Sequence, residues 1–270
     1  MFNSLDEQME RNDRISSSPR ERWIKYLTVL IASLLVFRVS PAARAGASAG
    51  APATRAAIRV AASGPPPAVI SGALHEYRPI RLELIEDTEQ RRLFRLYIKE
   101  HHYLGYRAPY GAQLRYWVRA TQPDLPPLAA LLFTSAAWRM APRDQFIGWS
   151  DEVRLRNLPL VINNSRFLIF PWTRIPHLAS HVLAQAARQL PKDWQARYCV
   201  EPVLMETLVD PGHCRGTCYR AANWMETGMT QGRGRMDRSH RTAGVSKQIF
   251  LFPLHRHWRQ RLCAAEITSG

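Results

Sequence analysis

The chain has 270 residues, 46% of them hydrophobic, which suffices for one good-sized domain, alone or with a poorly folded extension. Its charge is strongly basic, because 37 Lys and Arg face 22 Asp and Glu, and a net charge of +15 favours a polyanionic partner, nucleic acid before a membrane surface. Four cysteines in a chain of this length exclude a disulfide framework, so we expect reduced, intracellular thiols.

Residues 1–75 are predicted to form a low-complexity, disordered extension outside the fold. They hold an apolar run at 26–37 and an Ala-, Arg-, Gly- and Pro-rich stretch at 40–73. The run is too short for a membrane span, so we expect a cytoplasmic protein with no stable membrane association. Two alternatives stay open: a signal-peptide core with a cleavage pattern at Ala43-Arg44-Ala45, or a true start site further downstream.

The globular domain is predicted to span 76–263, followed by a tail at 264–270. Alternating and helical apolar patterns, with Asp87 and Ser150 as helix caps, define its elements. In chain order they are a strand at 81–86, a helix at 88–105, strands at 113–120 and 128–135, a helix at 151–161, a strand at 164–172, a helix at 177–190, a strand at 202–209 and a helix at 216–226. This order predicts an α+β domain.

The order resembles the GCN5-related N-acetyltransferase (GNAT) fold, a mixed central sheet flanked by helices. In that fold a turn before a helix binds the pyrophosphate of acetyl-coenzyme A, and Arg174, His177 and Ala179 stand at its signature positions. His177 replaces the central glycine, and Pro176 supplies no N–H, so both weaken the cradle for the pyrophosphate. The resemblance therefore implies an acetyltransferase-like fold without acetyl-coenzyme A binding.

Longer strings resemble the family that contains the Druantia anti-phage system protein A. They are HHYLGYRAPYG (101–111), RDQFIGWS (143–150), NNSRFLIFPWTRIPHLASHVL (163–183), ETLVDPGHCRGTCYRAANWMETGMTQGRGR (206–235) and FPLHRHWRQRLC (252–263). This resemblance implies a bacterial protein of phage defence or of a mobile element, with other components of such a system as partners. Relatives also form the N-terminal part of insertion-sequence transposases, so the chain looks like a stand-alone member or a remnant of a larger element.

Two carboxylates are candidate catalytic groups. Glu206 and Asp210 lie at one strand end, where carboxylates can hold Mg²⁺ for phosphoryl transfer. Four residues along a strand span about 13 Å, so a shared ion requires the chain to turn at Asp210. We favour the alternative in which Asp210 caps the turn at Pro211-Gly212 and Glu206 pairs with an arginine.

Three further groups each have a structural and a chemical interpretation. His102 could act as a general base or close its helix C-terminus as a favourable cation. Tyr219 could attack a DNA phosphodiester, but a packing role fits its position better. Cys214 and Cys218 lack zinc-finger spacing, so no metal is assigned.

The stretch from 211 to 260 is strongly basic and includes the flexible segment QGRGR at 231–235. The residues expected to contact nucleic acid are Arg215, Arg220, Arg233, Arg235, Arg238, Arg241 and Lys247. The leading hypothesis is therefore a DNA-binding or DNA-processing protein of a defence system or mobile element. Two rivals remain, an acyl-coenzyme A-dependent N-acetyltransferase and a Mg²⁺-dependent nuclease that uses Glu206 and Asp210, so whether the protein is an enzyme stays open.

Overall fold

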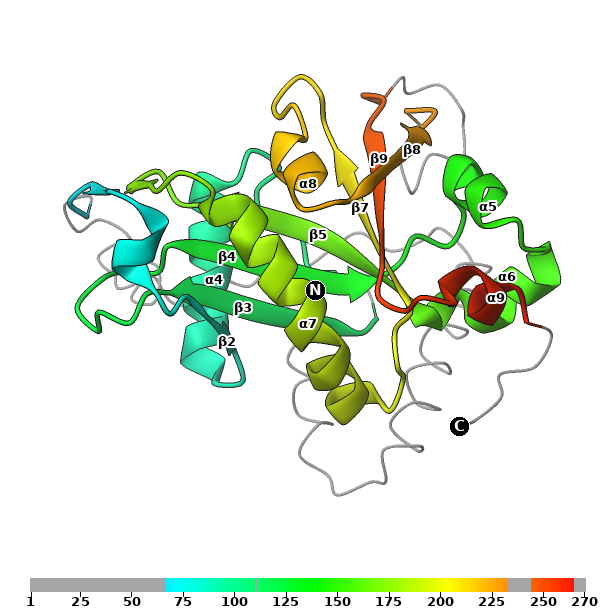
Figure 1. The fold of residues 1–270 in the computed structure, drawn as a ribbon, viewed down its shortest axis with the longest axis horizontal. Coiled ribbons are helices and arrows are strands. Elements are labelled where there is room, and N and C mark those ends of the chain that lie inside the picture. The colour runs from blue at the N-terminus through cyan, green and yellow to red at the C-terminus, as the bar shows by residue number, and fades with distance from the viewer. Residues whose placement is uncertain (1–66, 110, 233–243, 265–270) are drawn as a thin grey trace, which may run out of the picture.

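A single mixed β-sheet organises the molecule (Figure 1). The computed structural model describes residues 67–109, 111–232 and 244–264. In spatial order the sheet consists of β2 (Arg81–Leu84), β3 (Gln113–Arg119), β4 (Ala129–Ser135), β5 (Val161–Ile169), β7 (Leu204–Val209), β9 (Gln248–Pro253) and β8 (Met225–Met229). Neighbouring strands are antiparallel, except that β5 and β7 are parallel. The predicted α+β class with a mixed central sheet is confirmed.

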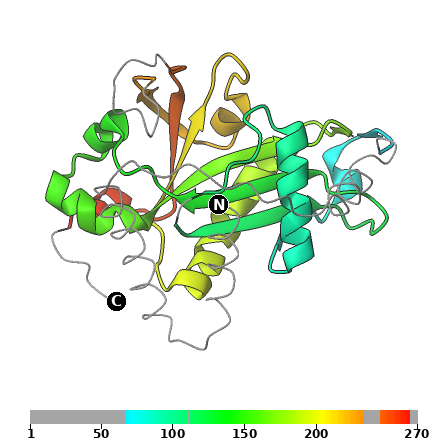
Figure 2. The same cartoon turned by 180° about the vertical axis from the view of Figure 1, so that it is seen from behind.

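Helices cover both faces and one end of the sheet. Helix α7 (Leu178–Tyr198) crosses the face that Figure 1 presents, and α4 (Thr88–His101) crosses the opposite face, seen in Figure 2. The shorter elements are β1 (Ile70–Ser71), η1 (Leu74–Tyr77), α5 (Ala141–Ile147), α6 (Asp151–Asn157), η2 (Leu158–Leu160), β6 (Thr173–Arg174), α8 (Thr217–Ala221) and α9 (Trp258–Cys263). None of the helices in the described ranges combines the length and apolarity that a membrane crossing requires.

Helix α4 begins at the predicted cap. The Asp87 side chain accepts a hydrogen bond from the backbone N–H of Glu89. In the first turn, the Gln90 Oε1 accepts a hydrogen bond of 3.0 Å from the Trp117 indole on β3. The side chains that α4 buries fully against the sheet are Phe94 and Ile98.

Helix α7 is longer than predicted. The helix was expected to end at Leu190, yet it continues through Pro191, which removes a backbone donor, to Tyr198. Trp194 and Tyr198 are buried in this extension, and the Tyr198 hydroxyl bonds both the N–H and the carbonyl of Gln113 at 2.9 Å. Packing against the sheet thus offsets the hydrogen bond that the proline removes.

Several predicted boundaries are wrong. The described fold already includes Ile70, which is buried and pairs with Thr173, so it begins before the expected boundary at 76. Helix α5 was not predicted, and α6 ends at Asn157, after which β5 begins at Val161 instead of 164. The predicted helix at 216–226 divides into α8 and the start of β8. Short helices and edge strands depend on tertiary contacts more than on local pattern.

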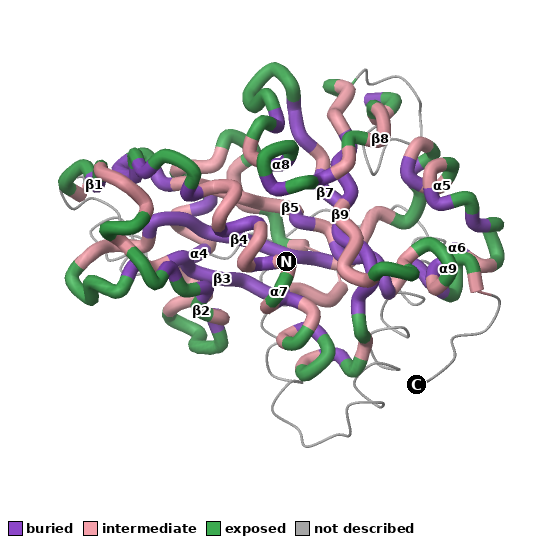
Figure 3. The backbone as a smooth tube through the Cα atoms, viewed as in Figure 1, coloured by how far each residue is buried: buried purple, intermediate pink, exposed green. Residues whose placement is uncertain are grey.

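Buried residues form two clusters that share the sheet (Figure 3). The larger cluster fills the space between the sheet, α4 and α7, and includes Phe94, Phe133, Val182 and Leu190. The smaller one lies among α5, α6, α9 and the adjacent ends of β7 and β9, and its members are Met140, Ile147, Trp149, Leu158, Leu160, Val161, Val203, Leu204, Ile249, Leu251 and Leu262.

The parallel strands β5 and β7 separate part-way along their length. Their pairing runs from Val161 opposite Leu204 to Asn164 opposite Thr207, and beyond this point β5 and β7 diverge (Figure 1). Ser165 is an extra residue in the ladder between β4 and β5, so Arg166 lies opposite Leu132. The bulge and the separation together place polar side chains where the sheet opens.

Candidate functional site

Three stacked rings lie where β5 and β7 separate. Tyr103, just after α4, stacks on His213 from the loop after β7, with ring centroids 4.2 Å apart and planes at 20°. His102 stacks on Tyr103 at 4.9 Å. Tyr103 is 45% exposed, so a large aromatic side chain faces solvent next to two histidines. The rings come from segments more than 100 residues apart, which only the fold brings together.

His102 ends α4 as a neutral ring. Its Nδ1 accepts a hydrogen bond of 3.2 Å from the Leu104 N–H. Burial, with the nearby charges of Arg166 and Lys247, lowers the pKa of His102 to about 4. His102 thus occupies the helix-closing position, and its low pKa disfavours the cationic form at neutral pH. As Nδ1 already accepts a hydrogen bond, the neutral ring carries its proton on Nε2 and can donate there.

Asp210 is buried and holds the loop that carries His213. Its Oδ1 accepts a hydrogen bond from the Gly212 N–H at 2.9 Å, and its Oδ2 lies 3.2 Å from His213 Nδ1. The turn cap is the structural role that the sequence favours for this residue. Because 56% of the His213 side chain is exposed, the carboxylate orients an imidazole that remains open to solvent.

Glu206 forms its hydrogen bonds in the interior of the fold and does not contact the ring stack. Its carboxylate accepts hydrogen bonds from Arg143 at 2.8 Å and from the Ala137 N–H at 3.1 Å, and neither the Glu206 nor the Arg143 side chain is exposed. This is the predicted pairing with an arginine. Across the described ranges, no group of three or more His, Cys, Asp or Glu side chains could hold a metal ion. Glu206 and Asp210 therefore each have protein partners of their own, which supports the structural interpretation over a shared Mg²⁺.

Tyr219 and the two neighbouring cysteines offer little accessible chemistry. Tyr219 packs between Phe250, at 5.6 Å, and Trp224, at 5.2 Å, and burial raises the pKa of its phenol well above the usual range. This environment fits the packing role. Burial also raises the pKa of the Cys218 thiol to about 11, whereas Cys214 is exposed. Tyr219 is thus poorly placed to attack a phosphodiester.

The positive charge predicted for 211–260 lies only partly in the described residues. Arg215 is exposed and Lys247 is half-buried beside His102, whereas Arg220 forms an ion pair of 2.6 Å with Glu226. The four arginines Arg233, Arg235, Arg238 and Arg241 lie outside the described residues.

The ends of the arginine-bearing segment meet beside Lys247. The backbones of Gly232 and Gly244 approach so closely that a Cβ on Gly232 would lie 2.2 Å from the Gly244 carbonyl oxygen. Thr230 fixes this junction, because its N–H donates to the Lys247 carbonyl and its hydroxyl accepts from the Lys247 N–H. Gly232 and Gly244, which flank residues 233–243, are therefore held together beside Lys247.

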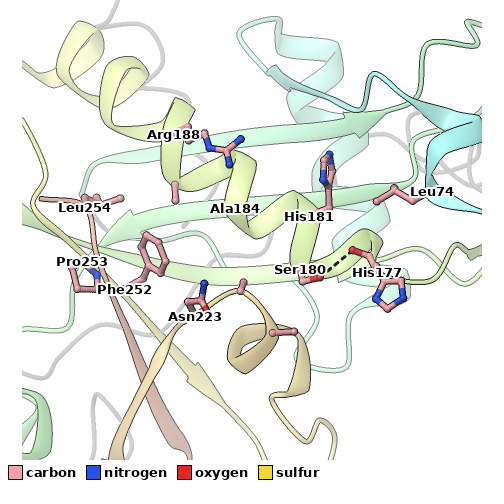
Figure 4. A pocket seen from close by; sticks show the side chains of 13 residues that line it. Leu74, His177, Ser180, His181, Ala184, Arg188, Asn223, Phe252, Pro253 and Leu254 are labelled. Carbon is pink, nitrogen blue, oxygen red and sulfur yellow. Dashed lines mark hydrogen bonds between the residues drawn. The ribbon is translucent and has the colours of Figure 1, made fainter. Parts of the chain in front are cut away.

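The turn that resembles a pyrophosphate cradle borders a separate cavity (Figure 4). His177 adopts φ 63°, the left-handed conformation in which the family pattern has glycine, and Arg174 and Pro176 are exposed beside it. The cavity, of about 530 Å³, lies between α7, the α8–β8 turn and the end of β9. Its lining includes His177, Ser180, His181, Arg188, Asn223 and Phe252. With a proline in the turn and a side chain at 177, the residues present do not reproduce the cradle, and Ala179 contributes only a methyl group.

Sequence reasoning missed three residues next to the ring stack. Arg115 on β3 and Arg166 on β5 lie on the α4 face of the sheet, and Tyr106 contacts Arg115 through its hydroxyl at 3.3 Å. An arginine between apolar strand residues, as in Leu114-Arg115-Tyr116, is a signal that was available. Its burial depends on the loop that covers the strand, which no local pattern predicts.

A family model described as Druantia protein DruA matches residues 64–261. The chain belongs to this family. The match covers both the ring stack and the buried arginines, and it agrees with the resemblance of the sequence strings. Membership of the Druantia family indicates a role in anti-phage defence.

Comparison with curated proteins found no match. Among solved structures, the aminoglycoside acetyltransferase AAC(6')-Ib in complex with coenzyme A is similar at 13% identity and a TM-score of 0.41, covering 67% of this chain and 98% of that one. An agmatine N-acetyltransferase mutant in its apo form is 12% identical with a TM-score of 0.38, over 64% of this chain and 99% of its own. A mutant of spermidine N-acetyltransferase SpeG from Vibrio cholerae is 9% identical with a TM-score of 0.40, over 67% and 97%. Similarity at this level carries no conclusion about the chemistry of this chain.

Proposed function

We propose that this DruA-family chain is a DNA-binding component of an anti-phage defence system. The DNA contact lies on what we call the Tyr103 surface, formed by Tyr103, His213, Arg166, Arg215 and Lys247. These residues come from β5, from the loops after α4 and β7, and from the position just before β9. The proposal covers binding, and strand cleavage is not part of it.

The exposed stack of Tyr103 on His213 is the observation that carries the proposal. A solvent-facing aromatic ring can stack on an unpaired base, and such stacking tolerates any sequence. Arg166 and Lys247 lie close enough to His102 for their positive charges to lower its pKa. The same two charges are available to bind the phosphates of the strand. The one buried carboxylate of the loop, Asp210, is already engaged by His213 and by the Gly212 N–H.

The position of the arginine-bearing segment adds support. Gly232 and Gly244 meet near Lys247 of the Tyr103 surface, and the chain between these two glycines carries the four arginines expected to contact nucleic acid, which lie outside the described residues. Counterion release by several arginines makes binding strong at low salt and steeply dependent on salt. A stacking platform next to a cationic segment is typical of proteins that bind single strands.

Fluorescence anisotropy with labelled single- and double-stranded DNA over a salt series tests the proposal on the full chain. We expect affinity to fall steeply with salt and single strands to bind more tightly. Lys247→Ala should weaken binding and lower the salt slope for single strands by about 0.7. The matched control is Lys192→Ala, which changes an exposed lysine on α7.

Two outcomes contradict the proposal. One is the absence of binding at low salt, and the other is equal binding by wild type and Lys247→Ala at every salt concentration. Product bands that appear only with Mg²⁺ would instead support the nuclease hypothesis.

A further inference from the structure

Two arginines with little exposure lie in one row of the sheet. Arg115 on β3 and Arg166 on β5 are both register partners of Leu132 on β4. All three side chains therefore lie on the same face of the sheet, the face that α4 covers. Adjacent strands lie about 4.8 Å apart, which places the two arginine backbones roughly 10 Å from each other. The segment after α4 bonds both guanidinium groups, through Gly105 and Tyr106.

Arg115 is buried without a compensating charge. The residue is 6% exposed, and its guanidinium donates only to neutral groups, the Gln113 side-chain oxygen at 2.8 Å and the Tyr106 hydroxyl at 3.3 Å. Its Nε is buried and has no hydrogen-bond partner. Within the described part of the chain it forms no ion pair.

Arg166 is half-buried, and its guanidinium donates only to backbone carbonyls. Its Nε donates to the Gly105 carbonyl at 3.1 Å and its Nη1 to the Ser165 carbonyl at 2.6 Å. Burial lowers the pKa of Arg166, and so does the positive charge of Arg107, while only the phenols of Tyr103 and Tyr106 oppose this effect. In the described ranges no carboxylate faces this guanidinium.

Buried arginines elsewhere in the fold have carboxylate partners. Arg143 pairs with Glu206 and Asp144, and Arg154 pairs with Asp144 and Asp151. A buried charge without a counterion is strongly unfavourable, so this chain places carboxylates where a buried arginine serves the fold. Arg115 and Arg166 depart from that pattern on the same sheet face.

We propose that Arg115 and Arg166 form an internal anion site that takes a phosphate group. Two guanidinium forks match the charge and the several oxygen acceptors of a phosphate monoester, and the Tyr106 hydroxyl offers a further donor. The phosphate belongs either to the end of a DNA strand or to a small phosphate ester. This inference goes beyond DNA binding, because such a site takes phosphate whether or not the Tyr103 surface binds a strand.

Thermal unfolding of the full chain in inorganic phosphate and in chloride at equal ionic strength tests the site. We expect the Tm to rise by roughly 5–10 °C at a phosphate concentration about 100 times the Kd, and to increase with the logarithm of the concentration above the Kd. Arg115→Met should abolish this logarithmic rise and leave only the weak stabilisation, growing in proportion to concentration, that phosphate gives most proteins. The control is Arg139→Gln, which changes an exposed arginine in the loop between β4 and α5 and should keep the full rise.

The Tm of Arg115→Met in chloride shows whether Arg115 serves a ligand site or stabilises the fold. Removing an uncompensated buried charge should leave the Tm in chloride unchanged or raise it, whereas loss of a structural arginine lowers it. If Arg115→Met does not fold, Tyr106→Phe and Arg166→Gln provide the test, and each should weaken the response to phosphate. The proposal is overturned if the Tm of the wild type shows no logarithmic response to phosphate, or if these variants keep that response in full.

Oligonucleotides distinguish the two sources of phosphate. If the site holds a strand end, a 5′-phosphorylated single strand binds the wild type at least tenfold more tightly than its 5′-hydroxyl form, and Arg115→Met removes the difference. If it holds a small ester, both strands bind equally and a nucleoside monophosphate reproduces the rise in Tm. The response to inorganic phosphate does not depend on DNA, so a failure of the DNA proposal and a failure of this one give different results.

Discussion

Two regions of this fold bury arginine side chains, and they treat the charge in opposite ways. At the corner formed by α5, α6 and β7, Arg143 and Arg154 are surrounded by Asp144, Asp151 and Glu206. Under the segment after α4, Arg115 and Arg166 meet only carbonyl, amide and phenol oxygens. This difference shows that burial alone does not identify a functional arginine. A poorly exposed arginine that has no carboxylate partner is a candidate to bind an external anion.

The paired region is a structural joint. Arg143 connects α5 to β7 through Glu206 and also donates to the Ala137 carbonyl at 2.9 Å. Asp144 accepts hydrogen bonds from the Met140 N–H and from the Trp149 indole, which fixes both ends of α5. Charged groups here replace the apolar contacts that a seven-residue helix cannot supply by itself.

The largest expected effect follows from breaking this joint. Arg143→Met leaves the Glu206 carboxylate buried without its cation, so the free energy of unfolding should fall by about 3–5 kcal/mol. Urea unfolding at constant m-value measures the change. The control is Arg139→Gln, which removes an exposed ion pair with Asp151 and should cost about 1 kcal/mol or less. Equal losses for the two variants would show that the buried pair is not a structural joint.

A smaller effect is expected from the ring stack. Tyr103→Ala removes the exposed platform and should weaken single-stranded DNA binding by about 1–3 kcal/mol, while Tyr103→Phe keeps the stacking and most of the affinity. Anisotropy at one fixed salt concentration measures both variants. Trp138→Ala is the control, because Trp138 is also a largely exposed aromatic residue but lies outside the Tyr103 surface. If the two alanine variants bind equally, Tyr103 is not a contact.

The smallest effect concerns pH. The folded-state pKa of His102 is about 4, below its unfolded value near 6.5, so the unfolded chain binds this proton first as the pH falls. The contribution of His102 to stability is therefore lost as the pH drops from 6.5 towards 4.

Asparagine at this position keeps an acceptor for the Leu104 N–H and does not titrate. His102→Asn should flatten the dependence of Tm on pH within that window, and the control His75→Asn, at an exposed histidine in η1, should not. A wild-type curve that is flat from pH 6.5 to 4 would contradict the burial of His102.

Local features of the fold could be predicted from the sequence, and long-range ones could not. Asp87 marks the start of α4 because capping is decided within a few residues, and the apolar stripe from Leu178 to Leu190 identifies the buried face of α7. The passage of α7 through Pro191 could not be foreseen, since it depends on the packing of Trp194 against the sheet.

The candidate site was predicted in part. Asp210 and Glu206 have the roles that turn chemistry and charge pairing suggest, because both roles follow from residue type. The partner of Glu206 is 63 residues away, and Tyr103 meets His213 only because β5 and β7 separate beside α4. Such contacts are set by strand order, which no single segment encodes.

Hydrogen exchange with and without a single-stranded oligonucleotide compares the two regions most directly. Added DNA should slow exchange at 102–107 and 211–216 on the Tyr103 surface and leave 141–157 at the paired corner unchanged. Protection confined to 141–157, or no protection at 102–107 at a DNA concentration that saturates binding, would contradict the assignment of the unpaired arginines and the ring stack to ligand binding.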